Sequence, residues 1–118
     1  MKLVVRGRPC QLHKRAVFGN LDVYVNIRRM GNCTLLATCD AELLGKTLKD
    51  GKITFHVHEK FYKGSRVTVE EALELIRQST IVNMVGRKIV KEAIEHGFVH
   101  PEAVLTIDGI PHAQIVKV

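Results

Sequence analysis

The sequence predicts an α+β domain in which helices pack on one face of a mostly antiparallel sheet, in two layers. Three observations predict this class. Segment 21–28 alternates apolar and polar residues, segment 68–97 repeats apolar residues at helical spacing, and Asp108–Gly109 separates two β-prone runs near the C-terminus. Because the strand-like and helix-like segments are segregated along the chain, we expect the helices to form a layer on one side of the sheet.

The first two strands are predicted on either side of a tight turn. Gly31–Asn32 suits a type II′ hairpin turn, after which 33–38 returns as the partner strand. Asp40 is expected to cap a short helix, 41–44, which Gly45 ends. The first strand is half-buried: Leu21, Val23, Val25 and Ile27 alternate with Asp22, Tyr24, Asn26 and Arg28.

A third strand is predicted after Asp50–Gly51, with 48–51 interpreted as a turn. The alternation over 53–58 places His56 and His58 on the polar face of that strand. Residues 63–65 are expected to form the loop that leads into the helical segment.

Two helices in succession are predicted from Thr68 to Gly97. Thr68 and Glu71 have the spacing of a capping box, and the apolar face that follows is Val69, Ala72, Leu73 and Ile76. After a polar break at 78–80, the apolar cluster 81–85 leads into a second helical period, Ile89, Ala93 and Ile94. Gly97 is expected to end that helix as its C-cap residue.

A final hairpin is predicted with strands 104–107 and 110–116 around a type I′ turn at Asp108–Gly109. Pro111 cannot donate a hydrogen bond to a strand ladder, which favours an edge position for the last strand.

Composition indicates one ordinary globular domain. The 118 residues are 46% hydrophobic and 25% charged, with no apolar run long enough for a membrane span and no secretory signal pattern. Three cysteines without a CxxC motif fit the reducing cytoplasm better than a disulfide framework. We therefore expect a cytoplasmic protein without membrane contact, with a single domain over 21–118.

The basic charge is concentrated in residues 1–20, which we interpret as an N-terminal extension. Residues 21–118 hold 13 basic and 12 acidic residues, so the net charge of +6 comes mostly from the extension. A basic arm is attracted to polyanions such as RNA, although a solubilising tail is the alternative. Its five basic residues are Lys2, Arg6, Arg8, Lys14 and Arg15.

Two further segments are candidates for binding an anion. Lys60 and Lys63 flank the aromatic pair 61–62, a combination found in nucleic-acid-binding surfaces. Arg87 and Lys88 fall in the first turn of the second helix, where basic residues oppose the helix dipole unless an anion is close.

A phosphate or an acidic side chain would supply the anion that this helix start lacks. Asn83 and Gly86 interrupt the apolar run just before it, which adds both residues to the candidate site. The alternative is that Asn83 caps the helix, Gly86 allows close packing, and both basic side chains are solvated.

The last strand offers a different kind of site. His112 and Gln114 share one strand face on either side of the small Ala113, so an edge strand here is a candidate for binding a ligand or a partner peptide. The alternative is a polar row that faces solvent.

No catalytic or metal-binding pattern is specific enough to assign. Gly45–Lys46–Thr47 lacks the glycine that a phosphate-binding loop needs five positions earlier, where Asp40 stands. No spacing of histidine and cysteine matches a zinc site, and a nucleophilic pair of Cys33 or Cys39 with His112 would need partners that the fold must supply. We predict no metal, no cofactor and no catalytic residue, and we lean against an enzyme.

Four segments together resemble the archaeal "domain of unknown function 424" family: 40–46, 61–64, 80–86 and 109–116. The resemblance covers about Leu21–Val118. It implies an archaeal cytoplasmic protein with a small two-layer α+β fold, and it supplies no activity, cofactor or catalytic residue. Family members begin near the first clear strand, which again makes residues 1–20 an extension.

These observations favour a non-catalytic protein that binds RNA or a ribonucleoprotein through its basic segments. One alternative is a protein–protein interaction module, or a homodimer, formed through the edge strand 111–116. Another is a small enzyme that uses His112.

Overall fold

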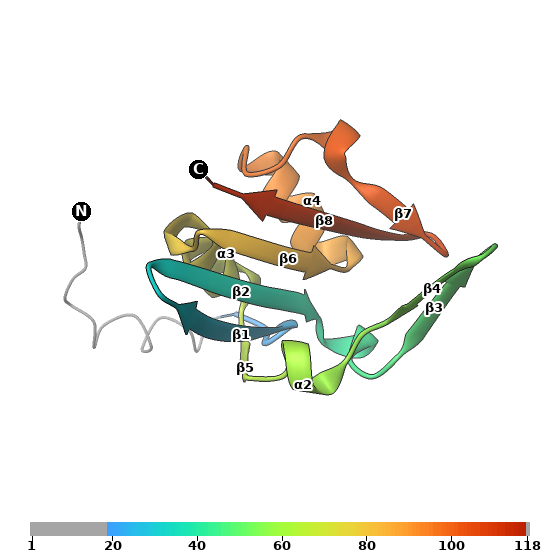
Figure 1. The fold of residues 1–118 in the computed structure, drawn as a ribbon, viewed down its shortest axis with the longest axis horizontal. Coiled ribbons are helices and arrows are strands. Elements are labelled where there is room, and N and C mark those ends of the chain that lie inside the picture. Colours follow the sequence, from blue (N-terminus) through green and yellow to red (C-terminus); the bar gives the residue numbers. More distant parts are fainter. Residues whose placement is uncertain (1–18, 118) are drawn as a thin grey trace.

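The structure is a computed structural model, and it describes residues 19–117. A six-stranded sheet carries two helices, α3 (Val69–Gln78) and α4 (Arg87–Glu95), on one face (Figure 1). The strands follow in the spatial order β5 (Ser65–Val67), β1 (Val23–Met30), β2 (Cys33–Asp40), β6 (Ile81–Val85), β8 (Ile110–Val116) and β7 (Leu105–Ile107). This arrangement confirms the predicted α+β class with a mostly antiparallel sheet.

The two predicted hairpins form with the expected turns. β1 pairs antiparallel with β2, and Gly31 at the turn has φ +62° whereas Asn32 has a negative φ, as in a type II′ turn. β7 pairs antiparallel with β8, and both Asp108 (φ +53°) and Gly109 (φ +75°) lie in the left-handed region, as a type I′ turn requires.

The capping box of α3 is also confirmed. The Thr68 hydroxyl accepts a hydrogen bond from the Glu71 N–H at 3.1 Å, and a Glu71 carboxylate oxygen accepts one from the Thr68 N–H at 3.0 Å. Two N–H groups at the helix start thereby gain partners that the helix cannot supply.

The interpretation of 81–85 as the lead into a second helix is wrong. These residues form β6, which runs parallel to β2 from the pair Leu35–Ile81 and antiparallel to β8 on its other side. Val82 and Met84 face the helices and Val85 faces the opposite side, so the strand needs apolar side chains in both directions. A continuous apolar run is typical of such a central strand.

Residues 46–67 contain more structure than predicted. Thr47–Asp50, partly interpreted as a turn, is strand β3, which pairs with β4 (Ile53–His56) in a separate two-stranded sheet. The turn itself is Gly51–Lys52. Helix α2 (Glu59–Tyr62) follows, and Ser65 begins β5 instead of ending a loop.

The edge position predicted for the last strand is wrong at Pro111, because β7 pairs with Ile110–His112 on the side away from β6. Among the described residues, Ala113–Val116 have no strand paired on that side. Pro111 fits between β6 and β7 without a lost hydrogen bond. The Pro111 carbonyl accepts a hydrogen bond from the Gly86 N–H at 2.9 Å. Any other residue at position 111 would donate its own N–H to the Gly86 carbonyl. That carbonyl already accepts a hydrogen bond from the Val90 N–H at 3.1 Å, in the first turn of α4. The missing N–H of proline therefore leaves no acceptor empty at this place.

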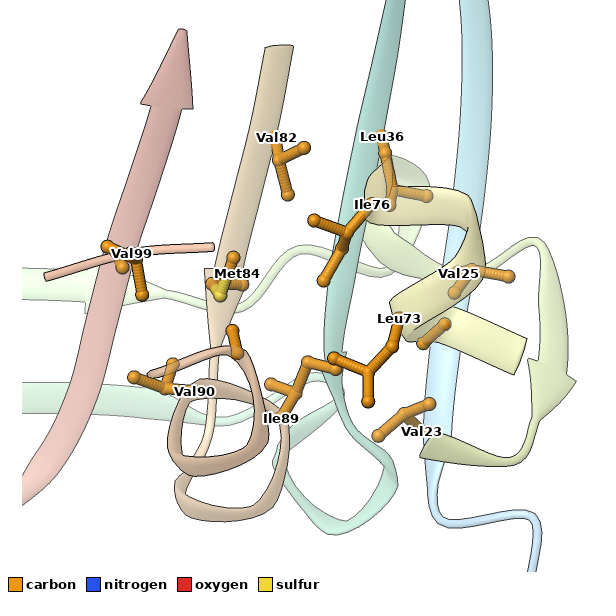
Figure 2. Close-up of a cluster of buried hydrophobic side chains, with 13 residues drawn as sticks. Val23, Val25, Leu36, Leu73, Ile76, Val82, Met84, Ile89, Val90 and Val99 are labelled. Atoms are coloured by element: carbon orange, nitrogen blue, oxygen red, sulfur yellow. The ribbon is translucent and has the colours of Figure 1, made fainter. Parts of the chain in front are cut away.

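The core has one cluster on each face of the sheet. On the helix face, side chains from β1, β2 and β6 meet those of α3 and α4 (Figure 2). On the other face, Cys39, Val85 and Ile110 are covered by Leu43, Leu48, Val57 and Tyr62, which come from the segment between β2 and β5. This second cover reaches only one end of the sheet, so the rest of that face stays open.

Candidate functional site

The sequence predicts an anion at the start of α4, where Arg87 and Lys88 lie. The structure shows that this anion is the carboxylate of Asp40. Asp40, at the end of β2, is 1% exposed. Its two carboxylate oxygens accept hydrogen bonds from the Lys88 N–H at 2.9 Å and the Ile89 N–H at 3.1 Å. Asp40 thus caps α4, and it makes no side-chain cap for the 3-10 helix η2 (Ala41–Leu43) that the sequence assigned to it.

Gly86 makes room for this carboxylate. A Cβ atom on Gly86 would overlap the carboxyl carbon and both oxygens of Asp40, and its φ of +130° disfavours any other residue. Asn83 is not the helix cap, because it lies within β6 and is paired with Ala37 and Gln114.

Arg87 and Lys88 are not brought together with the other basic candidates. The Lys88 ammonium lies 3.7 Å from the Asp22 carboxylate, on the helix side of the sheet. Arg87 lines a cavity of about 360 Å³ that is also lined by Lys46, Asp40, Glu42 and Asp108. Three carboxylates beside two cations do not favour a phosphate there, and Thr47 begins a strand, not the helix that a phosphate-binding loop requires.

The sheet face opposite the helices offers another candidate surface. α2 and the β3–β4 hairpin cover one end of it, and the end where β1 turns into β2 and β8 finishes is left uncovered (Figure 1). We call the uncovered part the open face. By register and burial its side chains are Arg28, Met30, Cys33, Leu35, Ile81, Asn83, Gln114 and Val116. Ala37 and Asn26 share this side of the sheet but lie in its covered part, where Ala37 is buried and the Asn26 amide bonds to α2.

Basic and aromatic side chains gather where β1 meets α2 and β5. Arg28 donates a hydrogen bond to the Lys60 carbonyl at 2.6 Å and lies over the Phe61 ring, 5.6 Å from its centroid. Arg66 lies over the Tyr24 ring at 5.7 Å. With Lys60 and Lys63, both exposed, these residues form what we call the β1-edge cluster: Tyr24, Arg28, Lys60, Phe61, Lys63 and Arg66.

Glycine and amide contacts fix the position of this cluster. Gly64 packs so close to β1 that an added Cβ would overlap the Val25 carbonyl. The Asn26 amide donates to the Phe61 carbonyl at 3.0 Å. The backbone of 60–64 is therefore held against the edge of β1.

His112 and Gln114 share one strand face, as the sequence predicted; this face lies opposite the helices, and Ala113 points the other way. Ala113 is buried against the helices. His112 packs edge-on against Phe55 with ring centroids 5.0 Å apart, and burial lowers its pKa below 6.5. Gln114 alone is exposed, on the open face beside Asn83.

Cys39 and His112 are not within reach of each other for nucleophilic catalysis. Cys39 and His112 lie in the same row of side chains with Val85 between them, roughly 10 Å apart at ordinary strand spacing. Burial, with the nearby carboxylates of Asp40 and Glu42, raises the pKa of the Cys39 thiol to about 12. Within residues 19–117 no three His, Cys, Asp or Glu side chains lie close enough together to hold a metal ion.

A family model described as "Protein of unknown function (DUF424)" matches residues 27–118. The chain belongs to this family. A crystal structure of an uncharacterised conserved protein from the archaeon Methanopyrus kandleri is similar to it, with 28% sequence identity, a TM-score of 0.69, and coverage of 79% of this chain and 89% of that one. A search of curated proteins gave no significant match.

Membership in the family confirms the resemblance inferred from the four segments, and two of their glycines now have physical reasons. Gly64 allows α2 to approach β1, and Gly86 makes room for Asp40. The basic residues of the N-terminal extension lie outside the described residues. In the part of the chain that the structure describes, no helix is long and apolar enough to cross a membrane.

Sequence reasoning missed Tyr24, Arg28 and Arg66 as candidates. The alternation in the first strand did place Tyr24 and Arg28 on its polar face, which was a usable signal. Arg66 had none, because its pairing with Tyr24 depends on β5 returning to the outer edge of β1.

We expect Gly86→Ala to lower the free energy of unfolding by about 2–4 kcal/mol, because the added methyl group displaces the Asp40 carboxylate and the backbone is strained. Urea denaturation measures the change. The matched control is Gly51→Ala, which also has a positive φ (+62°) but has nothing within 4 Å of its added Cβ. A loss at Gly86 no larger than the loss at Gly51 would contradict the role of the contact.

We expect the stability that Asp40 contributes to fall as pH rises. Burial raises the pKa of this carboxyl above 3.8, against the lowering effect of the Lys88 and Ile89 N–H groups. The folded state therefore binds the proton more tightly than the unfolded chain. The contribution is full below 3.8 and is lost as pH rises through the higher folded pKa.

The measurement is the difference in free energy of unfolding between the native protein and Asp40→Asn, taken from about pH 3 to about pH 8. As pH rises, the free energy of unfolding of the native protein should fall relative to that of Asp40→Asn. A difference that increases with pH would show that the N–H groups outweigh burial, and a flat one would show that the two effects cancel; either result contradicts the prediction.

We expect Cys33 to react with a thiol reagent and Cys39 to be spared in the folded protein. Cys39 is fully buried and its thiol ionises only near pH 12, whereas Cys33 is partly exposed on the open face. The measurement uses a Cys10→Ser variant and mass spectrometry after brief labelling. Equal labelling of both residues would contradict the burial of Cys39.

Proposed function

We propose that the protein is a cytoplasmic, non-catalytic RNA-binding protein that uses the β1-edge cluster and the adjoining open face. The observation that carries the proposal is the placement of charge. Arg28 and Arg66 point to this side of the sheet and Lys60 and Lys63 are exposed beside it, whereas Glu59 is the one acidic residue that β1, α2 and β5 contain.

The total charge does not account for this placement, since residues 21–118 hold 13 basic and 12 acidic residues. The helices of the opposite layer are close to neutral, with five acidic residues (Glu70, Glu71, Glu74, Glu92, Glu95) and four basic ones (Arg77, Arg87, Lys88, Lys91). The β1-edge cluster instead has four cations beside one exposed carboxylate, that of Glu59 on α2. Such a local excess of positive charge attracts a polyanion even when the net charge is small.

The two arginine–aromatic pairs favour single-stranded RNA over a purely electrostatic partner. Unpaired bases stack on aromatic rings and on guanidinium planes, and Phe61 and Tyr24 are only partly buried beneath Arg28 and Arg66. Phosphate contacts from the lysines would add affinity with little dependence on sequence.

A protein partner is the second candidate, because the open face also carries an apolar row. Leu35, Ile81 and Val116, the last 60% exposed, form this row, and Met30, 52% exposed, lies in the next row beside Cys33. A ribonucleoprotein would use both surfaces together, and a homodimer would bury the row against its copy. Light scattering at increasing concentration distinguishes the homodimer, which doubles the measured mass.

We expect the double variant Arg28→Ala/Arg66→Ala to weaken binding of single-stranded RNA about tenfold or more at low salt. The magnitude of the slope of log affinity against log salt concentration should fall by about 2, because each arginine removed leaves one phosphate without its cationic partner. Fluorescence anisotropy of a labelled RNA of about twelve nucleotides measures both quantities.

The control is Arg77→Ala/Lys91→Ala, which removes the same charge from the helix layer. It should change neither affinity nor slope appreciably. Equal loss in both variants would show general charge attraction without a site, and absence of RNA binding by the native protein near physiological salt would overturn the proposal.

The N-terminal extension is tested in the same assay. Replacing its basic residues with glutamine should flatten the salt dependence further if the extension also contacts phosphates. An unchanged slope would assign binding to the folded domain alone. The five residues to replace are Lys2, Arg6, Arg8, Lys14 and Arg15.

A further inference from the structure

We infer that Asn83 and Gln114 form a site on the open face that binds the hydrogen-bonding edge of an unpaired RNA base. The inference rests on the proposed function and adds to it. The β1-edge cluster accounts for phosphate contacts and stacking, and it leaves the carboxamides on β6 and β8 without a role.

The two carboxamides are direct neighbours. Asn83 and Gln114 are opposite each other in the antiparallel pairing of β6 and β8, so their Cβ atoms lie about 4.5–5.5 Å apart on the same face. Gln114 is exposed and Asn83 is partly exposed. Both amide groups are therefore accessible from the same side of the sheet.

Ala37 continues this row on the other side of Asn83, opposite it in the parallel pairing of β2 and β6. Ala37 is buried in the covered part of this face, so the accessible part of the row ends at Asn83. One row along the strands, Leu35 and Ile81 provide apolar surface. A planar group that lies beside the amides would rest on these side chains.

The chemistry of the pair matches a base and not a phosphate. Each carboxamide presents a donor and an acceptor side by side, and the exposed edge of an unpaired base presents the complementary pair. A phosphate offers only acceptors and is bound better by Arg28 and the neighbouring lysines. A strand of RNA crossing from β1 to β8 would meet the cations first and the amides next.

The test compares two probes, a labelled single-stranded RNA of about twelve nucleotides and an abasic backbone of the same length. We expect Asn83→Ala/Gln114→Ala to weaken RNA binding about tenfold, to leave binding of the abasic backbone unchanged, and to leave the salt slope unchanged because no charge is lost. The matched control is Gln78→Ala, which removes a carboxamide from the helix layer.

Two results overturn the inference and are distinguishable. If the native protein binds neither probe, the proposed function fails and the base site fails with it. If RNA binds the native protein and the double variant equally well, the base site fails and the proposed function remains. The exposed Gln114→Ala variant alone provides the measurement if the double variant unfolds at a lower temperature than the native protein.

Discussion

The buried carboxylate of Asp40 connects the two layers of this fold at one place. Asp40 ends β2, and its oxygens hold the first N–H groups of α4, which begins directly after the neighbouring parallel strand β6. Gly86 is the junction: its N–H bonds to β8, its carbonyl starts α4, and its missing side chain leaves the space for the carboxylate. The position of α4 over the sheet follows from this contact, as does the tolerance of Pro111 in an inner strand.

Both helices of the main layer lie on the same face of the sheet. The segment between β2 and β5 returns across the opposite face and covers only one end, so part of that face is left uncovered. The bare remainder adjoins Arg28 and Arg66, whose positions are fixed by backbone carbonyls and aromatic rings. Because these two arginine side chains are already held in place, they would lose little conformational entropy if a ligand bound to them.

Local sequence patterns were sufficient to predict the parts of the fold that depend on residues close together in the sequence. The capping box of α3, both hairpin turns and the two-layer class are of this kind. The position of Ile81–Val85 was not predictable in the same way, because a short apolar run is compatible with strand or helix until its neighbours are known. The partner of Asp40 is 48 residues away, and the pairing of Arg66 with Tyr24 depends on a strand of three residues. The basic–aromatic segment 60–63 was found from sequence, and its arginine partners were not.

The proposed RNA binding by the open face can be followed residue by residue in an NMR titration of the full-length, ¹⁵N-labelled protein with single-stranded RNA. We predict that the amide signals that shift most belong to β1, α2, β6 and β8, including Arg28, Phe61, Asn83 and Gln114. Signals of the outer faces of α3 and α4 should remain in place. Shifts concentrated on α3 and α4, or no shifts at physiological salt, would contradict the assignment of the open face as the RNA-binding surface.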